Sequence, residues 1–348
     1  MINFDNCEIA NIVIHNAGNK YEGGDLTISD ACFLPDDADV VNLLKNYFLS
    51  PFRKDAFYRF VSYEGDLMNN PVYHSVNQVF DSESAFYDSS VEIANQLFEQ
   101  SNNPNIKPGE VYIVHFKNCN VEEGVCDAIG IFKSETKDTF LKIIMNQNTL
   151  QLKSESGINI KKLDKACLVF NVRPEEGYKV SILDKTNTKE AVYWTTDFLG
   201  LEPCNESYFQ TANYLNLCKD FVKDIYNREN DVPRADQIDM LNRSIDFFKG
   251  NEVFSEDRFK DEVVREPEVI SAFENFRKQY EVDKEVPLSD SFNVSEFAVK
   301  DEKKYFKHVL KLDKNFHVYI HGQRKYIEKG YDTARDMNFY KLYFRDEE

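Results

Sequence analysis

The chain has 348 residues and a formal net charge of -18, and hydrophobic residues make up 42% of it. This apolar content supports a packed core and excludes a globally disordered chain, whereas the negative charge excludes a protein that wraps nucleic acid over its whole surface. The sequence has no run of about 18 uninterrupted apolar residues, so we expect no membrane-spanning helix.

The N-terminal segment and the cysteines indicate the compartment. The segment MINFDNCEIANIVIH has neither a basic start nor a long apolar run, so we expect no signal peptide. Seven cysteines, an odd number, are spread from Cys7 to Cys218. This pattern favours reduced thiols over a disulfide framework and predicts a cytoplasmic protein.

Residues 1–202 are predicted to form one α+β domain. Asp36–Phe48 begins with carboxylates after Pro35, as helix N-termini do, and Ser84–Gln100 is the second predicted helix. The segment CNVEEGVC is typical of a hairpin turn, with Gly124 at a position that accepts positive φ. The predicted strands are short and rich in branched residues: Glu8–His15, Glu110–Phe116, Cys126–Lys133, Phe140–Met145, Ala166–Val172, Tyr178–Leu183 and Ala191–Trp194.

After Pro203 the apolar residues change to a helical period, so residues 203–348 are predicted as a helical region that ends in a short basic β segment. Asn315–Ile320 and Phe339–Phe344 are the expected strands of a closing sheet. The fold class is therefore α+β. The residues with helical spacing are Tyr214, Cys218, Phe221, Val222 and Ile225, then Ile238, Leu241, Ile245 and Phe248, then Val269, Phe273, Phe276 and Tyr280.

A basic segment near the C-terminus, residues 303–329, stands out in this acidic chain. It contains seven lysines and one arginine against only Asp313 and Glu328, a local balance of +6. Lysines bind phosphates, and interleaved aromatic rings stack on bases or pack in a core. The candidate nucleic-acid-binding residues are Lys303, Lys304, Lys307, Lys311, Lys314, Arg324, Lys325 and Lys329, and the interleaved aromatic residues are Tyr305, Phe306, Phe316, Tyr319 and Tyr326.

Two interpretations of the basic segment remain open. Lys303, Lys307 and Lys311 recur at helical spacing, so a helix there places them, with Lys304, along one side as a phosphate-docking patch. Alternatively, the segment is a solvated face that neutralises the acidic body.

Three other motifs have structural explanations that we weigh against functional ones. His317 and His321 are four apart in a predicted strand, which separates them by about 13 Å and disfavours a shared metal ion. Cys119 and Cys126 flank the hairpin turn and are expected to be buried thiols, so no metal site is predicted. Trp194 is expected to pack in the core, with a ligand-stacking role as the alternative.

One motif raises an enzymatic alternative. Asp127, Glu135 and Lys137 resemble a compressed form of the carboxylate and lysine pattern of metal-dependent nucleases, in which carboxylates hold Mg²⁺. A solvated hairpin end is the competing explanation. The sequence contains no phosphate-binding glycine loop, dinucleotide-binding fingerprint or zinc-protease motif, and no cofactor is predicted.

The segment VYWTTDFLGLEPCNESYFQT, residues 192–211, resembles the signature region of the bacterial 37-kDa nucleoid-associated protein family. IANIVIHNAGNK resembles the opening strand of that family, VYIVHFK and DAIGIFK its central hairpin, and LKLDKNFHVYIHG its late segment. The resemblance implies a bacterial protein located at the nucleoid and defined by no enzymatic reaction.

We therefore expect a non-enzymatic, nucleoid-associated protein that contacts DNA locally and weakly or reaches the nucleoid through a protein partner. The alternatives are a protein-interaction module without nucleic-acid contact and a metal-dependent nuclease. No membrane contact is expected, and no feature of the sequence defines an oligomeric state.

Overall fold

The computed structural model describes residues 2–52, 56–62, 65–146, 149–184, 193–204, 207–306, 309–320 and 326–346. The chain divides into two compact units, Met1–Cys204 and Asn205–Glu348. The first is built on a large sheet and the second on helices, which confirms the α+β class. No helix within the described ranges is long and apolar enough to cross a bilayer.

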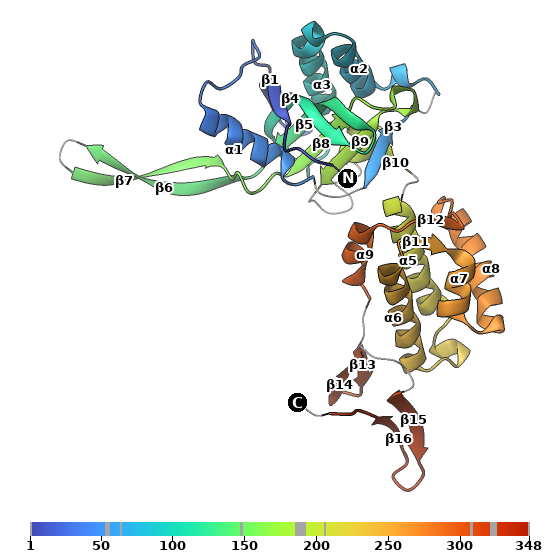
Figure 1. Cartoon of the computed structure of the whole chain (residues 1–348). Helices are drawn as coiled ribbons and strands as arrows, with labels where there is room; N and C mark the ends of the chain where they lie inside the picture. Colours follow the sequence, from blue (N-terminus) through green and yellow to red (C-terminus); the bar gives the residue numbers. More distant parts are fainter. Residues whose placement is uncertain are drawn as a thin grey trace. The chain divides into compact units, whose positions relative to one another are not determined.

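The first unit is built on an eight-stranded antiparallel sheet in the order β10-β3-β9-β8-β5-β4-β1-β2 (Figure 1). The central strand β8 is buried along its whole length because helices cover both faces of the sheet. The strands are β1 Glu8–Ala17, β2 Leu26–Thr27, β3 Phe57–Phe60, β4 Gly109–Val121, β5 Gly124–Ser134, β8 Lys165–Phe170, β9 Lys179–Asp184 and β10 Leu201–Pro203. The predicted hairpin turn joins β4 to β5, with Gly124 at φ +126°.

Three helices pack on this sheet. Helix α1, Ala38–Leu49, covers one face, and α2, Pro71–Asp81, and α3, Phe86–Gln100, cover the other. Helix α2 was not predicted from the sequence, although its first residues show a recognisable helix-capping pattern. The Asn70 side chain accepts hydrogen bonds from the backbone N–H groups of Val72 and Tyr73, and Pro71 occupies the first helical turn. Short 3-10 turns, η1 Leu67–Asn69 and η2 Glu83–Ala85, flank α2.

The strand predicted at Ala191–Trp194 is wrong where the structure describes it, because Tyr193–Phe198 forms a π-helical turn. Residues 191 and 192 lie outside the described residues. Branched and aromatic residues fit a buried helical turn as well as a buried strand, so the local pattern does not separate the two. The turn places Trp194 in the core with 0% of its surface exposed, which confirms its predicted packing role.

The remaining strands of the first unit, β6 Lys137–Asn146 and β7 Thr149–Ile158, pair only with each other as a long hairpin that projects from the sheet (Figure 1). The predicted strand Phe140–Met145 is therefore confirmed within β6, whereas β7 was not predicted.

The second unit is a helical bundle. Its long helices, α5 Ser207–Asp224, α6 Arg234–Gly250 and α8 Pro267–Lys284, confirm the helical period predicted after Pro203. Their apolar faces meet in an aromatic core that includes Tyr214, Phe221 and Phe273. The smaller elements are η5 Arg228–Asn230, β11 Val253–Ser255, α7 Glu256–Phe259, η6 Lys260–Val264, β12 Ser291–Asn293 and α9 Glu296–Lys303.

Two separate hairpins end the chain, rather than the one closing sheet that was predicted. Strand β13, Val309–Leu312, pairs with β14, Phe316–Tyr319, and β15, Ile327–Asp332, pairs with β16, Met337–Leu342. The apolar sides of the hairpins meet the N-terminal half of α6, because Leu310, Ile320 and Ile327 pack with Ala235 and Ile238.

A buried histidine predicts how the first unit responds to acid. Burial lowers the pKa of His15 below its usual 6.5. The Ser29 backbone N–H donates to Nδ1 at 3.2 Å, and Nε2 lies 3.2 Å from Ser90 Oγ, so the ring is neutral with its proton on Nε2. As the pH falls below about 6.5, His15 therefore binds a proton in the unfolded chain before it does so in the folded chain. The free energy of unfolding decreases in that range.

When the pH is lowered from about 6.5 to 5.5, we expect the free energy of unfolding to decrease less for the His15→Asn variant than for the wild type. One histidine contributes at most about 1.4 kcal/mol over one pH unit. Urea unfolding at the two pH values measures this difference. The His317→Asn variant, on an exposed strand position, is the control, and an equal pH dependence of the wild type and His15→Asn would contradict the expectation.

Candidate nucleic-acid interface

The basic segment does not form one helical stripe. Lys303 is the last residue of α9 and Lys304 caps it, so the helix ends before Lys311, which lies on β13. Lys314 lies in the turn between β13 and β14, and Lys329 lies on β15. Lys307, Arg324 and Lys325 lie outside the described residues. The prediction that Lys303, Lys304, Lys307 and Lys311 share one side of a helix is therefore wrong for Lys311.

The five described lysines of the segment are nevertheless all exposed. None of them lies within ion-pair distance of a carboxylate in the part of the chain that the structure describes. An exposed ammonium group without such a partner keeps its charge available to an anion from solution. These lysines are Lys303, Lys304, Lys311, Lys314 and Lys329.

The aromatic residues of the segment separate into two groups. Phe306 is buried in the core of the helical bundle, where it anchors the chain after α9. Tyr305, Phe316, Tyr319 and Tyr326 are exposed. Two ammonium groups lie near the ring of Tyr305, because Lys219 Nζ and Lys304 Nζ are each 5.0 Å from its centroid.

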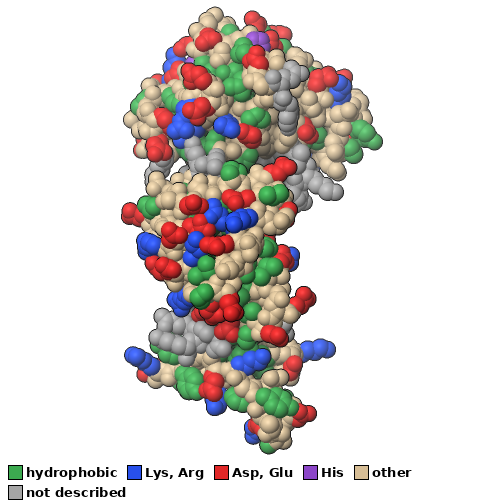
Figure 2. Space-filling model, turned by 90° about the vertical axis from the view of Figure 1, so that its right-hand side faces the viewer, with side chains coloured by type: hydrophobic (Ala, Val, Ile, Leu, Met, Phe, Trp, Pro, Cys, Tyr) green, Lys and Arg blue, Asp and Glu red, His purple; other side chains and the backbone are tan. Residues whose placement is uncertain are grey.

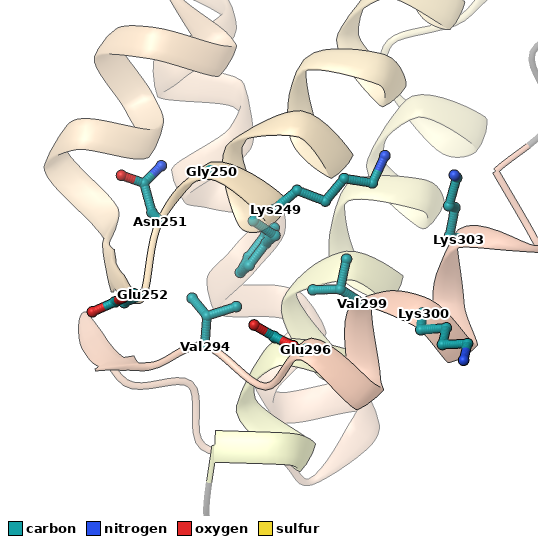
Figure 3. A pocket seen from close by; sticks show the side chains of 10 residues that line it. Lys249, Gly250, Asn251, Glu252, Val294, Glu296, Val299, Lys300 and Lys303 are labelled. Carbon is teal, nitrogen blue, oxygen red and sulfur yellow. The ribbon is translucent and has the colours of Figure 1, made fainter.

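Lys303 lines a groove of about 610 Å³ between the C-terminal end of α6 and helix α9 (Figure 3). Lys249 and Lys300 line it with Lys303, and the three lysines lie toward one end while Glu252 and Glu296 lie toward the other. Lys249 lies 3.6 Å from the exposed Asp246, but no described carboxylate pairs with Lys300. The lysine end of this groove therefore attracts anions.

Lys311 and Lys329 line a second groove, of about 800 Å³, between the start of α6 and the two C-terminal hairpins. The exposed Phe316 ring lies beside them. Cations and carboxylates are balanced here, so this groove is less suited to an anion than the first. Its charged lining residues are Arg234, Lys311, Lys329, Asp231, Asp313 and Asp336.

The two grooves lie at opposite ends of α6. Lys249 is in the last turn of this helix and Arg234 begins it. Since the helix has 17 residues at about 1.5 Å each, the length of α6 between the two grooves is about 25 Å.

The rest of the surface limits such a contact. Figure 2 shows one face of the molecule, on which acidic and basic side chains are interspersed over both units and no broad basic area is seen. On each unit, carboxylates lie among the lysines of this face. Any contact with phosphates is therefore restricted to small areas.

The structure separates the residues of the nuclease alternative. Asp127 lies near the start of β5 and Glu135 directly after its end, about 26 Å away at about 3.3 Å per residue. Two carboxylates that far apart do not hold one Mg²⁺ ion. Lys137 instead forms an ion pair with Glu110 at 2.5 Å.

Glu135 and Thr136 form a turn that Asp164 holds in place. Their backbone N–H groups donate to Asp164 Oδ2 at 2.8 and 3.0 Å, and the Thr136 hydroxyl donates to Oδ1 at 3.1 Å. The side chain of Glu135 is buried beside Lys133. This motif is therefore a structural turn at the base of the β6–β7 hairpin.

The structure also shows where the residues considered as metal ligands lie. His317 is exposed on β14, and His321 lies outside the described residues. Cys119 and Cys126 face each other across the β4–β5 hairpin, and Cys119 Sγ lies 3.2 Å from Cys7 Sγ. All seven cysteines are free thiols, as the sequence indicated. Among the described residues, no three His, Cys, Asp or Glu side chains are grouped as a metal site.

Sequence reasoning missed Lys249 and Lys300, which join Lys303 at the first groove. Lys300 and Lys303 are three apart on α9, a spacing that the sequence displays. Lys249, however, is more than 50 residues away along the chain, and only the packing of α6 against α9 brings it close.

Two comparisons with known proteins bear on the chain. A family model described as NA37, nucleoid-associated protein YejK, matches residues 13–337. This range includes all five described lysines of the basic segment. A search of curated proteins found no match.

Proposed function

The chain belongs to the NA37 family of nucleoid-associated proteins, and from this premise we propose that it binds DNA locally and weakly through lysines of its second unit, without catalysing a reaction. The location we propose is the nucleoid, within the cytoplasm. The observation that carries the proposal is that the five described lysines of the basic segment are exposed and none pairs with a described carboxylate.

Two groups of lysines would make the contact. Lys249, Lys300 and Lys303 lie at one end of the groove between α6 and α9, and Lys311 and Lys329 lie at the other end of α6. Such ammonium groups bind phosphates at the backbone of DNA and do not read its bases, so we expect no sequence preference. The exposed Phe316 ring lines the same groove as Lys311 and adds a surface on which an unpaired base stacks, whereas Tyr319 points to the opposite face of this hairpin from Phe316.

Binding should depend strongly on salt. Each phosphate that a lysine neutralises releases counterions, so three or four contacts predict that the affinity falls by about 10–10²-fold between 50 and 200 mM salt. The net charge of -18 opposes any wider contact and keeps the affinity low.

The expected effect of charge reversal follows from the same contacts. We expect the double variants Lys300→Glu/Lys303→Glu and Lys311→Glu/Lys329→Glu each to weaken binding at least about tenfold and to lower the salt slope by about 2, or about 1 for each lysine. Gel-shift titrations of duplex DNA at two salt concentrations measure both quantities. Thermal melts should change little, because exposed charges contribute little to stability.

The matched control is Lys223→Glu/Lys278→Glu. It makes the same change of net charge on exposed positions of α5 and α8, outside the basic segment. The proposal predicts a smaller effect for this control than for either test variant. Equal weakening by all three variants would mean that only net charge matters, and the proposed sites would be wrong.

A role as a protein-interaction module is the second candidate. The interspersed charges in Figure 2 favour it, because they leave little surface for a polyanion. In this case the wild-type protein does not retard DNA even at 50 mM salt, and it reaches the nucleoid through a protein partner. The nuclease alternative has no geometric support at Asp127 and Glu135.

A further inference from the structure

The β6–β7 hairpin has one face that nothing in its own unit covers. Its two strands pair only with each other over ten residues, from Lys137↔Ile158 at the base to Asn146↔Thr149 near the tip. Figure 1 shows the hairpin extending well beyond the eight-stranded sheet, with no helix lying against it. An isolated two-stranded hairpin is only marginally stable in water unless another element packs against one of its faces.

The strand register assigns the side chains to two different faces. Directly paired residues of an antiparallel hairpin point to the same side, and successive pairs alternate. One face therefore carries the pairs Leu141↔Ser154, Ile143↔Leu152 and Met145↔Leu150. The other face carries Phe140↔Glu155, Lys142↔Lys153 and Ile144↔Gln151.

The first of these faces is an apolar stripe without a charge between its base and its tip. Leu141, Ile143, Met145, Leu150 and Leu152 are each between 65% and 69% exposed. At about 100 Å² for each residue, the stripe is as large as the largest apolar patch of a typical monomeric protein, and such patches are often interaction surfaces.

We infer that the apolar stripe is the interface of a homodimer, in which the hairpins of two copies of this chain pack face to face. A two-fold interface brings the same surface of both copies together, so that surface must be complementary to itself. The stripe meets this condition because its own residues carry no charge, and Lys137, which lies on the same face at the base of the hairpin, is paired with Glu110. Two hairpins stacked about 10 Å apart would form a small two-layered sandwich.

The exposed area agrees with a weak, specific dimer. With on the order of 100 Å² exposed on each large apolar residue, five residues on each of two copies provide about 1,000 Å². The flanking Thr139, Ser154 and Ser156 lie on the same face and add to this area. Specific interfaces begin near about 1,200 Å² in total, so we expect a dissociation constant on the order of micromolar.

The opposite face of the hairpin carries charged residues that are compatible with exposure to solvent. Glu155 lies 3.7 Å from Lys142 Nζ and 3.3 Å from Lys153 Nζ, so the two paired lysines share one carboxylate between them. Of the two faces, the charged one is better suited to a DNA duplex, because the apolar stripe offers no hydrogen-bond donor to phosphates. The observations therefore favour a second copy of the chain on the stripe.

The test compares two double substitutions on opposite faces of the same hairpin. Ile143→Ser/Leu152→Ser changes a directly paired set on the stripe, and Phe140→Ser/Ile144→Ser changes apolar residues on the other face. Sedimentation equilibrium between about 1 and 100 µM brackets a micromolar constant. We expect the wild type and the Phe140/Ile144 variant to dimerise, and the Ile143/Leu152 variant to weaken the dimer at least about tenfold.

A deletion of the hairpin tests whether the substitutions weaken the dimer only because they unfold the hairpin. Asp138 and Gly157 are directly paired, so an Asn-Gly turn can join them in place of residues 139–156. The shortened protein should be monomeric with an unchanged melt of the remaining fold. The wild-type dimer should strengthen at higher salt, because two acidic copies repel each other less when screened.

Three results would overturn the proposal. One is a wild-type protein that stays monomeric at about 100 µM, well above the expected constant. Another is a dimer that the deletion leaves intact. The third is a monomer whose DNA binding is lost with the Ile143/Leu152 substitutions, since the stripe would then contact DNA and not a second copy.

Discussion

Replacing Trp194 with alanine is expected to lower the free energy of unfolding by about 3–5 kcal/mol. The ring is fully buried between the sheet and α3, its centroid lies 5.1 Å from that of Phe198, and its Nε1–H donates to Ala166 O at 3.4 Å. The substitution removes the apolar contacts and this hydrogen bond and leaves a large cavity.

Urea unfolding followed by circular dichroism measures this change, since the chain has only one tryptophan to report by fluorescence. Tyr319→Ala, which truncates an exposed ring on β14, is the matched control and should change stability by less than about 0.5 kcal/mol. If Trp194→Ala were as stable as the wild type, the ring would not be a core residue and the ligand-stacking alternative would gain support.

Replacing Glu135 with alanine is the second substitution with a large expected cost, again about 3–5 kcal/mol. The Glu135 and Lys133 side chains are 4% and 0% exposed, with Oε1 3.1 Å from Nζ. Burial lowers the pKa of Lys133, and the negative charge of Glu135 opposes that effect. Without Glu135 the buried lysine loses its ion-pair partner and keeps the Lys107 carbonyl as a hydrogen-bond acceptor at 2.7 Å.

A double variant makes this expectation specific. Lys133→Met/Glu135→Leu removes both charges and should restore stability to within about 1 kcal/mol of the wild type, because an apolar pair fills a similar volume without desolvated charge. Glu83→Ala removes the partner of an exposed lysine, Lys117, and should change stability much less than Glu135→Ala, because water screens an exposed ion pair. A Glu135→Ala protein that melts like the wild type would refute the buried-pair explanation.

Local sequence patterns determined most of the secondary structure. The helices α5, α6 and α8 follow from apolar residues at a 3.6-residue period, because a helix must bury one face. Strands β1, β4, β5, β6, β8 and β9 follow from short runs of branched residues between turn residues. The hairpin at Gly124 was also predictable, because few residues other than glycine adopt positive φ easily.

Other elements could not be decided from local patterns. The run of apolar residues at Tyr193 and Trp194 suits a strand and a buried helical turn equally, and only the packing of Trp194 against Ala166 and Phe198 selects the turn. The two C-terminal hairpins were predicted as one sheet because the sequence shows where strands begin but not which strands pair. Pairing depends on which apolar sides α6 covers.

The same division holds for the candidate site. The sequence by itself determined that residues 303–329 carry an excess of lysines that neighbouring carboxylates do not balance, since charge is a property of composition. Only the tertiary structure decided that the lysines form two groups at opposite ends of α6 and that Lys249 joins Lys303. The physical reason is that these relations depend on distances between elements remote in sequence, which packing of the core sets and no local pattern records.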